Sequence, residues 1–298
     1  MILPNKLTIP VPMEWAGRTV ESFLRQQLHF SRSRIRELKK NQAISCNGAV
    51  IWATSRLAGG ESLEIALNNP FQNMVPEALP LSIVYEDSDL IVVNKPAGMI
   101  VHPVGVYQNG TLANGLIAHW RNRGEAASFH PVHRLDRLTS GLIVVAKNPW
   151  AHQQLDLQIN SGALHRLYLA VCDGVPSPAS GRIDAPLKPS GTGFRWMVAA
   201  DGKAASTRFR VIQHFADDSL IVLKLYTGRT HQIRVHLCHL GHPLRGDFYY
   251  ANPDSRINRP ALHSARLRFI HPRTGRRLQL TAPIPEDFQP LLELEKNN

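Results

Sequence analysis

The segment that decides the fold of this chain is His133-Arg134-Leu135-Asp136-Arg137-Leu138-Thr139-Ser140-Gly141, which runs directly into the apolar stretch Leu142-Ile143-Val144-Val145. The apolar stretch is typical of a buried strand, and a carboxylate, Asp136, precedes it in a loop among cations. Reactive groups are commonly placed in loops that a rigid element holds. Nearby arginines keep a carboxylate ionised, so that it can act as a nucleophile or a base. A structural ion pair that leads into a β-turn explains the same pattern, and this segment alone leaves both interpretations open.

Working outward, most of the chain after residue 81 consists of short apolar stretches of the kind that form strands. Strands are expected at 81–85, 90–93, 142–146, 167–172, 207–212 and 220–226. Helices are expected at 112–121, 150–159 and 230–240. Strands in groups with occasional helices predict an α+β domain with a mainly antiparallel sheet and flanking helices. No expected strand leads into a glycine-rich phosphate loop, which argues against a nucleotide cofactor fold.

Three further segments carry candidate functional side chains, each with a purely structural alternative. Lys95 precedes a Pro-Ala-Gly turn, which by itself indicates only a turn with a lysine. Tyr168 lies on an expected strand and offers a flat ring for stacking and a phenol for proton transfer, although most such tyrosines belong to the core. Arg229 follows the Gly228 turn at the start of an expected helix, where it could reach across a cleft.

The helix after Arg229 is rich in histidine, which raises the question of a metal. Pairs three or four residues apart, such as His236 with His239 and Cys238 with His242, have the spacing of helical ligands. These two pairs point to different faces, and no cysteine pair or His-Glu-x-x-His segment supports them. We therefore expect no metal site.

The N-terminal part, from about residue 16 to 66, is expected to form a compact unit. Thr19 and Ser31 are candidate caps of two successive helices, and Asn47-Gly48 predicts a hairpin because both turn residues need positive φ. The second helix carries five cations: Arg32, Arg34, Arg36, Lys39 and Lys40. This arrangement resembles the alpha-L RNA-binding motif, and the resemblance implies that these cations bind phosphates rather than only solvating a helix face.

Residues 67–80, with three prolines, are expected to be a linker, so we divide the chain into 1–75 and 76–298.

Composition limits the partners and the compartment. Lys and Arg number 34 against 23 Asp and Glu, a net charge of +11 that favours a polyanionic partner. No apolar run is long enough to span a membrane. The three cysteines are far apart and odd in number, which argues against disulfides and favours a reducing cytoplasm.

Taken together, the segments around Lys95, Asp136, Tyr168 and Arg229 resemble the RluA family of pseudouridine synthases, from residue 83 to about 285. With the N-terminal unit, the layout is most similar to the RluC and RluD type, which modify large-subunit ribosomal RNA. Two residues depart from the family pattern: Leu138, where a polar or acidic residue is usual, and Arg166, where lysine is usual.

The resemblance implies an RNA uridine isomerase that needs no cofactor. It implies Asp136 as the essential carboxylate, Arg229 as its ion-pair partner and Tyr168 as the residue that packs against the base. It implies that Arg134 fills the gap when the uridine leaves its helix, with His133 and Lys95 as further RNA-binding residues. Ribosomal RNA is favoured as the substrate and transfer RNA is the alternative.

Two other functions remain open from the residues alone. A non-catalytic RNA-binding or ribosome-assembly factor would need the basic face but not Asp136. A hydrolase of the N-glycosidic bond would use a carboxylate too, but it would release free uracil and would usually need a second acid or an activated water. The sequence contains one candidate carboxylate loop, which favours isomerisation.

Overall fold

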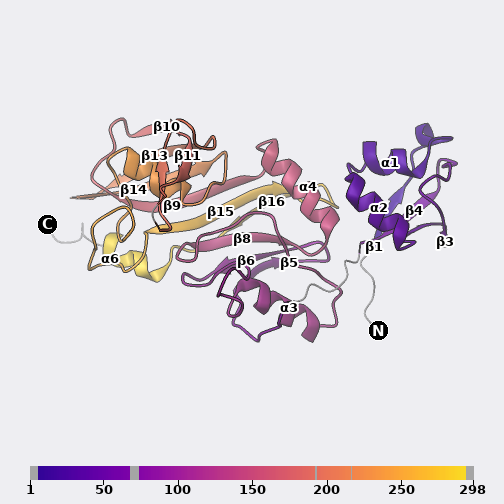
Figure 1. Ribbon diagram of the computed structural model, residues 1–298, viewed down its shortest axis with the longest axis horizontal. Helices are drawn as coiled ribbons and strands as arrows, with labels where there is room; N and C mark the ends of the chain where they lie inside the picture. The colour runs from indigo at the N-terminus through magenta and orange to yellow at the C-terminus, as the bar shows by residue number, and fades with distance from the viewer. Residues whose placement is uncertain (1–5, 68–73, 192, 216, 293–298) are drawn as a thin grey trace.

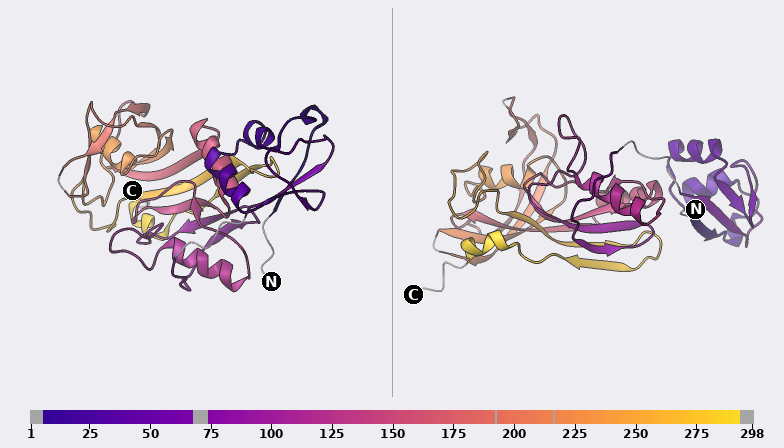
Figure 2. Two further views of the ribbon diagram at one scale, coloured as in Figure 1. Left: turned by 45° about the vertical axis from the view of Figure 1, so that its right-hand side comes forward. Right: turned by 90° about the horizontal axis from the view of Figure 1, so that it is seen from below.

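The computed structural model describes residues 6–67, 74–191, 193–215 and 217–292. The described residues form a four-stranded sheet, a ten-stranded sheet and a two-stranded sheet, which lie with their helices in one elongated molecule (Figure 1). The N-terminal unit lies at one end beside helix α4 (Pro149–Asn160), and helix α6 (Gln289–Leu292) lies toward the other end (Figures 1 and 2). The α+β class predicted from the sequence is confirmed. Within the described residues, no helix has the length and apolar character needed to cross a membrane.

The N-terminal unit is a four-stranded antiparallel sheet with two helices packed on it. Thr19 and Ser31 cap the helices as expected, each accepting a hydrogen bond from the backbone N–H three residues later at 3.2 Å. Asn47 and Gly48 form the predicted hairpin turn with φ of 48° and 84°. The first strand was not predicted; it pairs with the last strand of the unit and completes the sheet order β1-β4-β2-β3. The elements are β1 (Lys6–Pro10), η1 (Met13–Trp15), α1 (Val20–Gln26), α2 (Arg32–Lys40), β2 (Ile44–Cys46), β3 (Ala49–Val50) and β4 (Ser62–Ala66).

The expected linker is only partly described, because residues 68–73 lie outside the described ranges. Leu67 before it is fully buried in the core of the N-terminal unit. After it, the backbone N–H of Glu77 donates to Asn114 on helix α3 at 3.1 Å, and Asn114 donates to the carbonyl of Val75 at 2.7 Å. The residues that follow position 73 therefore already pack on the large domain.

The large domain is a ten-stranded sheet in the order β10-β13-β14-β9-β15-β8-β6-β5, with β16 paired to β15 and β7 to β8. Among the described strands, every pairing is antiparallel except that of β15 with β8, which confirms the mainly antiparallel sheet predicted from the sequence. The strands are β5 (Ile83–Glu86), β6 (Leu90–Lys95), β7 (His130–Pro131), β8 (Ser140–Ala146), β9 (His165–Asp173), β10 (Ser180–Asp184), β13 (Ser206–His214), β14 (Asp218–Leu225), β15 (Leu262–Ile270) and β16 (Arg277–Thr281). A separate hairpin pairs β11 (Leu187–Pro189) with β12 (Trp196–Val198).

The helices of the large domain belong to different hydrophobic cores. Residues of α3 (Leu112–Asn122) and α5 (Gln232–His239) share one core with Tyr168, whereas those of α4 (Pro149–Asn160) share another with the N-terminal unit. The short η2 (Glu286–Phe288) and α6 (Gln289–Leu292) pack in a third hydrophobic core that includes Val171 of β9. The three cysteines are free.

Gly141 explains how the loop that carries Asp136 meets the sheet. Its φ of 109° is open to glycine and strained for other residues, and a Cβ there would overlap the backbone of Ser264. Only glycine thus allows β15 to lie directly beside the first residues of β8. Because of this close approach, β15 and β6 both pair with the first residues of β8, which directly follow the loop that carries Asp136.

Candidate active site

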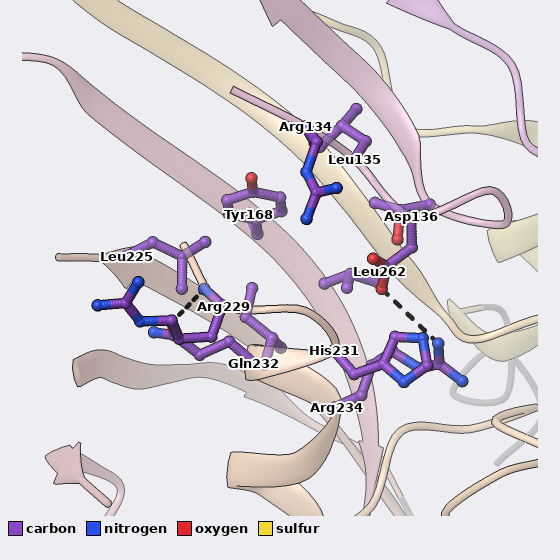
Figure 3. Close-up of a pocket in the computed structure, with 12 residues that line it drawn as sticks. Arg134, Leu135, Asp136, Tyr168, Leu225, Arg229, His231, Gln232, Arg234 and Leu262 are labelled. Atoms are coloured by element: carbon purple, nitrogen blue, oxygen red, sulfur yellow. Dashed lines mark hydrogen bonds and ion pairs between the residues drawn. The ribbon is translucent and has the colours of Figure 1, made fainter. Parts of the chain in front are cut away.

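A small pocket at the centre of the large sheet collects side chains from segments far apart in the sequence (Figure 3). Asp136 comes from the loop before β8, Tyr168 from β9, Arg229 from the turn before α5, and Arg134 from the same loop as Asp136. All four are candidate site residues predicted from the sequence, and they line one pocket. The lining residues are Arg134, Leu135, Asp136, Thr139, Tyr168, Leu225, Arg229, His231, Gln232, Ile233, Arg234 and Leu262.

The cation that faces Asp136 is Arg234, not Arg229 as predicted. Nη1 of Arg234 lies 3.6 Å from Oδ2 of Asp136. The expected partner, Arg229, instead donates through Nε to the carbonyl of Ala204 at 3.0 Å. Arg229 is exposed in the turn, whereas Arg234 projects from α5 and is buried, so helix geometry selects the residue five positions further on.

Arg234 is fixed from behind by a second carboxylate. Its Nε and Nη2 donate to the two oxygens of Asp247 at 2.7 and 2.6 Å, and Asp247 is fully buried. This fork-to-fork geometry uses one edge of the guanidinium and leaves Nη1 directed at Asp136. Asp136 is 29% exposed and Arg234 only 4%, so the carboxylate is open to the pocket while its cation is not. Neither Arg234 nor Asp247 was predicted; the only signal was an arginine inside the helix, which sequence alone does not aim.

Two more buried cations hold the backbone just after Asp136. Lys95 donates through Nζ to the carbonyls of Pro96, Met99 and Arg137 at 2.9, 2.9 and 3.2 Å. Arg259 donates through Nη1 to the carbonyl of Leu138 at 3.2 Å. Carbonyls that accept from rigid buried donors fix the loop conformation, and so the direction of the Asp136 side chain.

Tyr168 lies under the pocket with 3% of its surface exposed. Burial raises the pKa of its phenol, and the charge of Asp136 acts in the same direction. The hydroxyl therefore stays protonated at neutral pH, so Tyr168 presents an uncharged ring and a donor.

Comparison with known proteins identifies the family of the chain. Residues 89–239 match the family described as RNA pseudouridylate synthase, and residues 7–63 match the RluD ribosomal pseudouridine synthase N-terminal domain. The chain belongs to the RNA pseudouridylate synthase family. It is therefore an enzyme that isomerises uridine in RNA to pseudouridine, as the sequence resemblance indicated.

Relatives of this synthase match it over nearly its whole length. An uncharacterized RNA pseudouridine synthase of Bacillus subtilis, YlyB, is 39% identical over 98% of this chain and 99% of its own. The ribosomal large subunit pseudouridine synthase D of Neisseria meningitidis serogroup A is 38% identical over 97% of this chain and 82% of its own. The solved structure of human RNA Pseudouridylate Synthase Domain Containing 1 has 28% identity and a TM-score of 0.56, covering 70% of this chain and 84% of that one.

Two residues expected to contact RNA are not accessible in the synthase. Lys95 is fully buried, and burial lowers its pKa to about 7, with Asp136 opposing and Arg259 adding to the shift. His133 is buried as well, accepts a hydrogen bond from the backbone N–H of Val144 at 3.4 Å, and has its pKa lowered to about 3 by burial and by Arg166. Both side chains support the loop from inside, so their assignment to RNA contact was wrong. Arg134 is exposed at the pocket (Figure 3).

The basic helix of the N-terminal unit keeps three of its five cations exposed. Arg34 is buried and pairs with Glu37 at 2.8 Å, and Lys39 pairs with Glu21 at 2.6 Å. Burial removes Arg34 from the expected RNA-binding set, whereas Lys39, whose side chain is 39% exposed, stays a predicted RNA contact. The exposed cations of α2 are Arg32, Arg36 and Lys40.

The histidines of α5 and its neighbourhood have separate partners. His236 bonds Thr207 and the carbonyl of Ala185, both at 2.9 Å. His242 lies 2.9 Å from the carbonyl of Asp173, and His231 lies 2.9 Å from the hydroxyl of Tyr250. They pack the helix against different elements and do not converge on one point.

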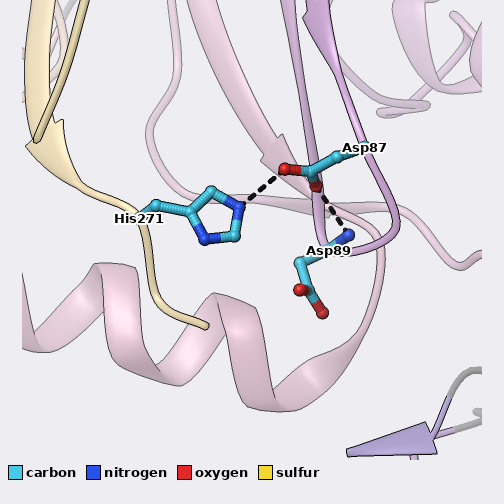
Figure 4. Close-up of side chains that lie close together, drawn as sticks. All are labelled: Asp87, Asp89 and His271. Carbon is cyan, nitrogen blue, oxygen red and sulfur yellow. Dashed lines mark hydrogen bonds and ion pairs between the residues drawn. The ribbon is translucent and has the colours of Figure 1, made fainter. Parts of the chain in front are cut away.

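A different group has the composition of a cation site, namely Asp87, Asp89 and His271 (Figure 4). His271 bonds Asp87 at 2.6 Å, and Asp87 also accepts from the hydroxyl of Tyr85 at 2.6 Å. Arg273 donates to both oxygens of Asp89 at 2.5 and 2.6 Å. A guanidinium thus already satisfies the buried carboxylate, and the group is an ion-pair network at the end of the sheet next to the N-terminal unit.

Proposed function

We propose that this synthase converts uridines of large-subunit ribosomal RNA to pseudouridine, with Asp136 as the catalytic carboxylate acting on a uridine turned out of its helix. The observation that carries the proposal is that Asp136 faces Arg234 in a pocket that Tyr168 also lines, with Arg234 held from behind by the buried Asp247. The named relatives that act on the large ribosomal subunit supply the substrate class. Transfer RNA is the alternative substrate.

The reaction needs one carboxylate and no redox partner. The bond between the sugar C1′ and the uracil N1 breaks, the base turns, and C1′ bonds to C5, with the proton of C5 released and one taken up at N1. A carboxylate at the pocket surface can act as nucleophile or base in this sequence. Arg234 keeps that carboxylate charged and aimed, and Tyr168 offers a flat face to the base.

Base flipping follows from the position of Asp136. Its carboxylate lies within a pocket, so a uridine stacked inside a helix would hold its glycosidic bond out of reach. Turning the base out costs about a few kcal/mol of lost stacking and pairing. The exposed side chain of Arg134, next to the pocket, is placed to occupy the gap that the base leaves.

The N-terminal unit, within a proposed first domain of residues 1–75, would bind RNA outside the pocket through Arg32, Arg36 and Lys40. Residues 76–298 would form the catalytic domain. The relatives from Bacillus subtilis and Neisseria meningitidis are bacterial, and in bacteria a ribosomal RNA substrate would place the enzyme in the cytoplasm.

The test is a transcriptome-wide pseudouridine map with and without the gene, paired with purified Asp136→Asn. The amide has nearly the same shape as the carboxylate but is not a nucleophile, so turnover should vanish while RNA affinity and melting temperature hardly change. Normal turnover by Asp136→Asn would refute the catalytic assignment. Release of free uracil by the wild type would favour the hydrolase, and sites confined to transfer RNA would replace the proposed substrate.

A further inference from the structure

A row of cations crosses the large sheet on the face opposite the catalytic pocket. Arg182 of β10 pairs in register with Arg208 of β13, and Arg208 pairs with Lys224 of β14. Beyond Lys224, the register continues through Leu167 of β9 to Arg266 of β15. Residues paired across strands project to the same face, with neighbouring strands about 4.7–4.9 Å apart. We call Arg182, Arg208, Lys224 and Arg266 the cation row.

The face of the row follows from alternation along two strands. Leu225 and Tyr168 line the catalytic pocket. Lys224 and Leu167 are their immediate neighbours in the chain, and successive side chains of a strand point to opposite faces. The cation row therefore lies on the other side of the sheet and takes no part in the pocket.

The row is open to solvent and is hardly neutralised. Arg208 and Arg266 are exposed, and Arg182 is 56% exposed where it pairs with Asp184, itself 58% exposed. Lys224 has His165 as its neighbour at 3.5 Å, and the exposed Arg268 also bonds His165, at 3.0 Å. Like charges directly opposite each other on a sheet are destabilising, so this arrangement costs stability unless an anion lies over it.

An exposed aromatic ring lies within the row. Tyr226 is 38% exposed, with Cζ of Arg182 at 4.9 Å and Nζ of Lys224 at 5.1 Å from its ring centre. Cations that follow a phosphate backbone, combined with aromatic rings for bases, are the features of surfaces that bind flexible nucleic acid. An acidic protein partner would pair with the cations but would not need an exposed aromatic ring beside them.

We propose that the cation row is a second RNA-binding surface, which holds a flexible segment of the substrate RNA other than the one that enters the pocket. The inference requires the substrate to be RNA, but it does not depend on which RNA or which uridine is modified. A long RNA would thus contact both faces of the sheet, while a short fragment would reach only the pocket.

The test is the full-length chain with Arg208→Gln and Arg266→Gln together, both in an Asp136→Asn background so that turnover does not intervene. The matched control is Arg121→Gln with Arg123→Gln, which removes the same charge from exposed positions at the end of α3. Affinity for a transcript of large-subunit ribosomal RNA and for a twelve-nucleotide oligouridylate is measured over a range of salt concentrations. With the long transcript, the row variant should lower the log–log salt slope by up to about 0.7–0.9 per lost contact, and the control should not.

The short oligouridylate should bind the row variant and the control alike. Unchanged affinity and slope of the row variant on the long transcript would overturn the proposal, as would an equal loss in the control. A melting curve at low salt gives a second measurement, in which removing opposed like charges should leave the variant at least as stable as the parent. The salt slope measures phosphate contacts with any long RNA. The comparison between the row variant and the control therefore stays valid even if the substrate of the enzyme is not ribosomal RNA.

Discussion

At the residue scale, one guanidinium serves two carboxylates that have different tasks. Asp247 is buried and accepts two hydrogen bonds from Arg234. Asp136 is partly exposed and forms only an ion pair with Arg234, with Nη1 of Arg234 at 3.6 Å from Oδ2 of Asp136. The first pairing fixes the guanidinium, and the second leaves the oxygens of Asp136 free for a substrate. This division would let Asp136 act as the proposed catalytic carboxylate while its orientation is set.

Arg234→Met should therefore cost far more activity than Arg229→Met. Truncating one partner of a buried, hydrogen-bonded charge pair costs about 2–5 kcal/mol, and here it removes the cation beside Asp136 as well. Arg229 is exposed and bonds only a backbone carbonyl, so its loss should be milder. Single-turnover rates at saturating enzyme measure the difference.

Arg234→Met also leaves Asp247 buried without its partner, so a stability loss must be separated from a catalytic one. The double variant Arg234→Met with Asp247→Leu removes both buried charges and should regain much of the melting temperature without regaining activity. Equal and mild losses from Arg234→Met and Arg229→Met would contradict the role given to Arg234.

At the element scale, the side chain of Arg259 connects the 3₁₀ helix η2 to the loop that carries Asp136. Arg259 bonds Asp287 of η2 at 2.5 and 2.7 Å, and the same guanidinium donates to the carbonyls of Leu138 and Leu262 at 3.2 Å each. The packing of the chain end is thereby coupled to the loop that carries Asp136.

Asp287→Asn should lower the single-turnover rate more than it lowers RNA affinity. Asp287 is 44% exposed, so the free-energy loss should be modest, about 1 kcal/mol, or roughly fivefold in rate. Glu286→Gln changes the adjacent exposed carboxylate and serves as the control. A rate for Asp287→Asn equal to that of Glu286→Gln would show that η2 does not position the loop.

At the scale of the whole molecule, three histidines that fold without charge make the protein sensitive to acid. Burial lowers the pKa of His133 to about 3 and those of His130 and His263 to about 4. In the unfolded chain these residues take up protons below about pH 6.5. Between pH 6.5 and 4 the unfolded state therefore binds more protons than the native state, so stability should fall as pH is lowered through this window.

Urea unfolding at several pH values measures that slope, and His133→Asn should flatten it. A free energy of unfolding that stays constant from pH 6.5 to 4 would contradict the prediction, because it would mean that the three histidines take up protons equally in the folded and unfolded states.

Removal of residues 1–75 should weaken RNA binding more than it slows the chemical step. The side chain of Gln154 on α4 donates to the carbonyl of Leu28 at 3.1 Å, and apolar residues of the two units belong to one hydrophobic core. Some loss of melting temperature is therefore expected as well. The salt slope of affinity should fall by up to about 0.7–0.9 for each lost phosphate contact. The full chain carrying Arg32→Gln, Arg36→Gln and Lys40→Gln should reproduce that change without the loss of stability. A folded truncation with unchanged affinity and slope would exclude RNA binding by the N-terminal unit.

The sequence alone was sufficient for features that depend on neighbours along the chain. Helix caps at Thr19 and Ser31, the Asn47-Gly48 hairpin and the α+β class follow from local hydrogen bonding, backbone freedom and apolar spacing. The loop with Asp136 was found in the same way, because its residue types and the strand behind it are contiguous.

Only the tertiary structure decided which side chains meet. Arg229 and Arg234 are five residues apart, and the rotation of α5 against the sheet determines that the second faces Asp136. Lys95 and His133 were expected to bind RNA, but strand packing encloses them. The cation row depends on the register of strands that are distant in sequence, and a shift of one residue would turn each of its side chains to the other face. Burial and register are set by long-range packing of the chain, and no local pattern contains that information.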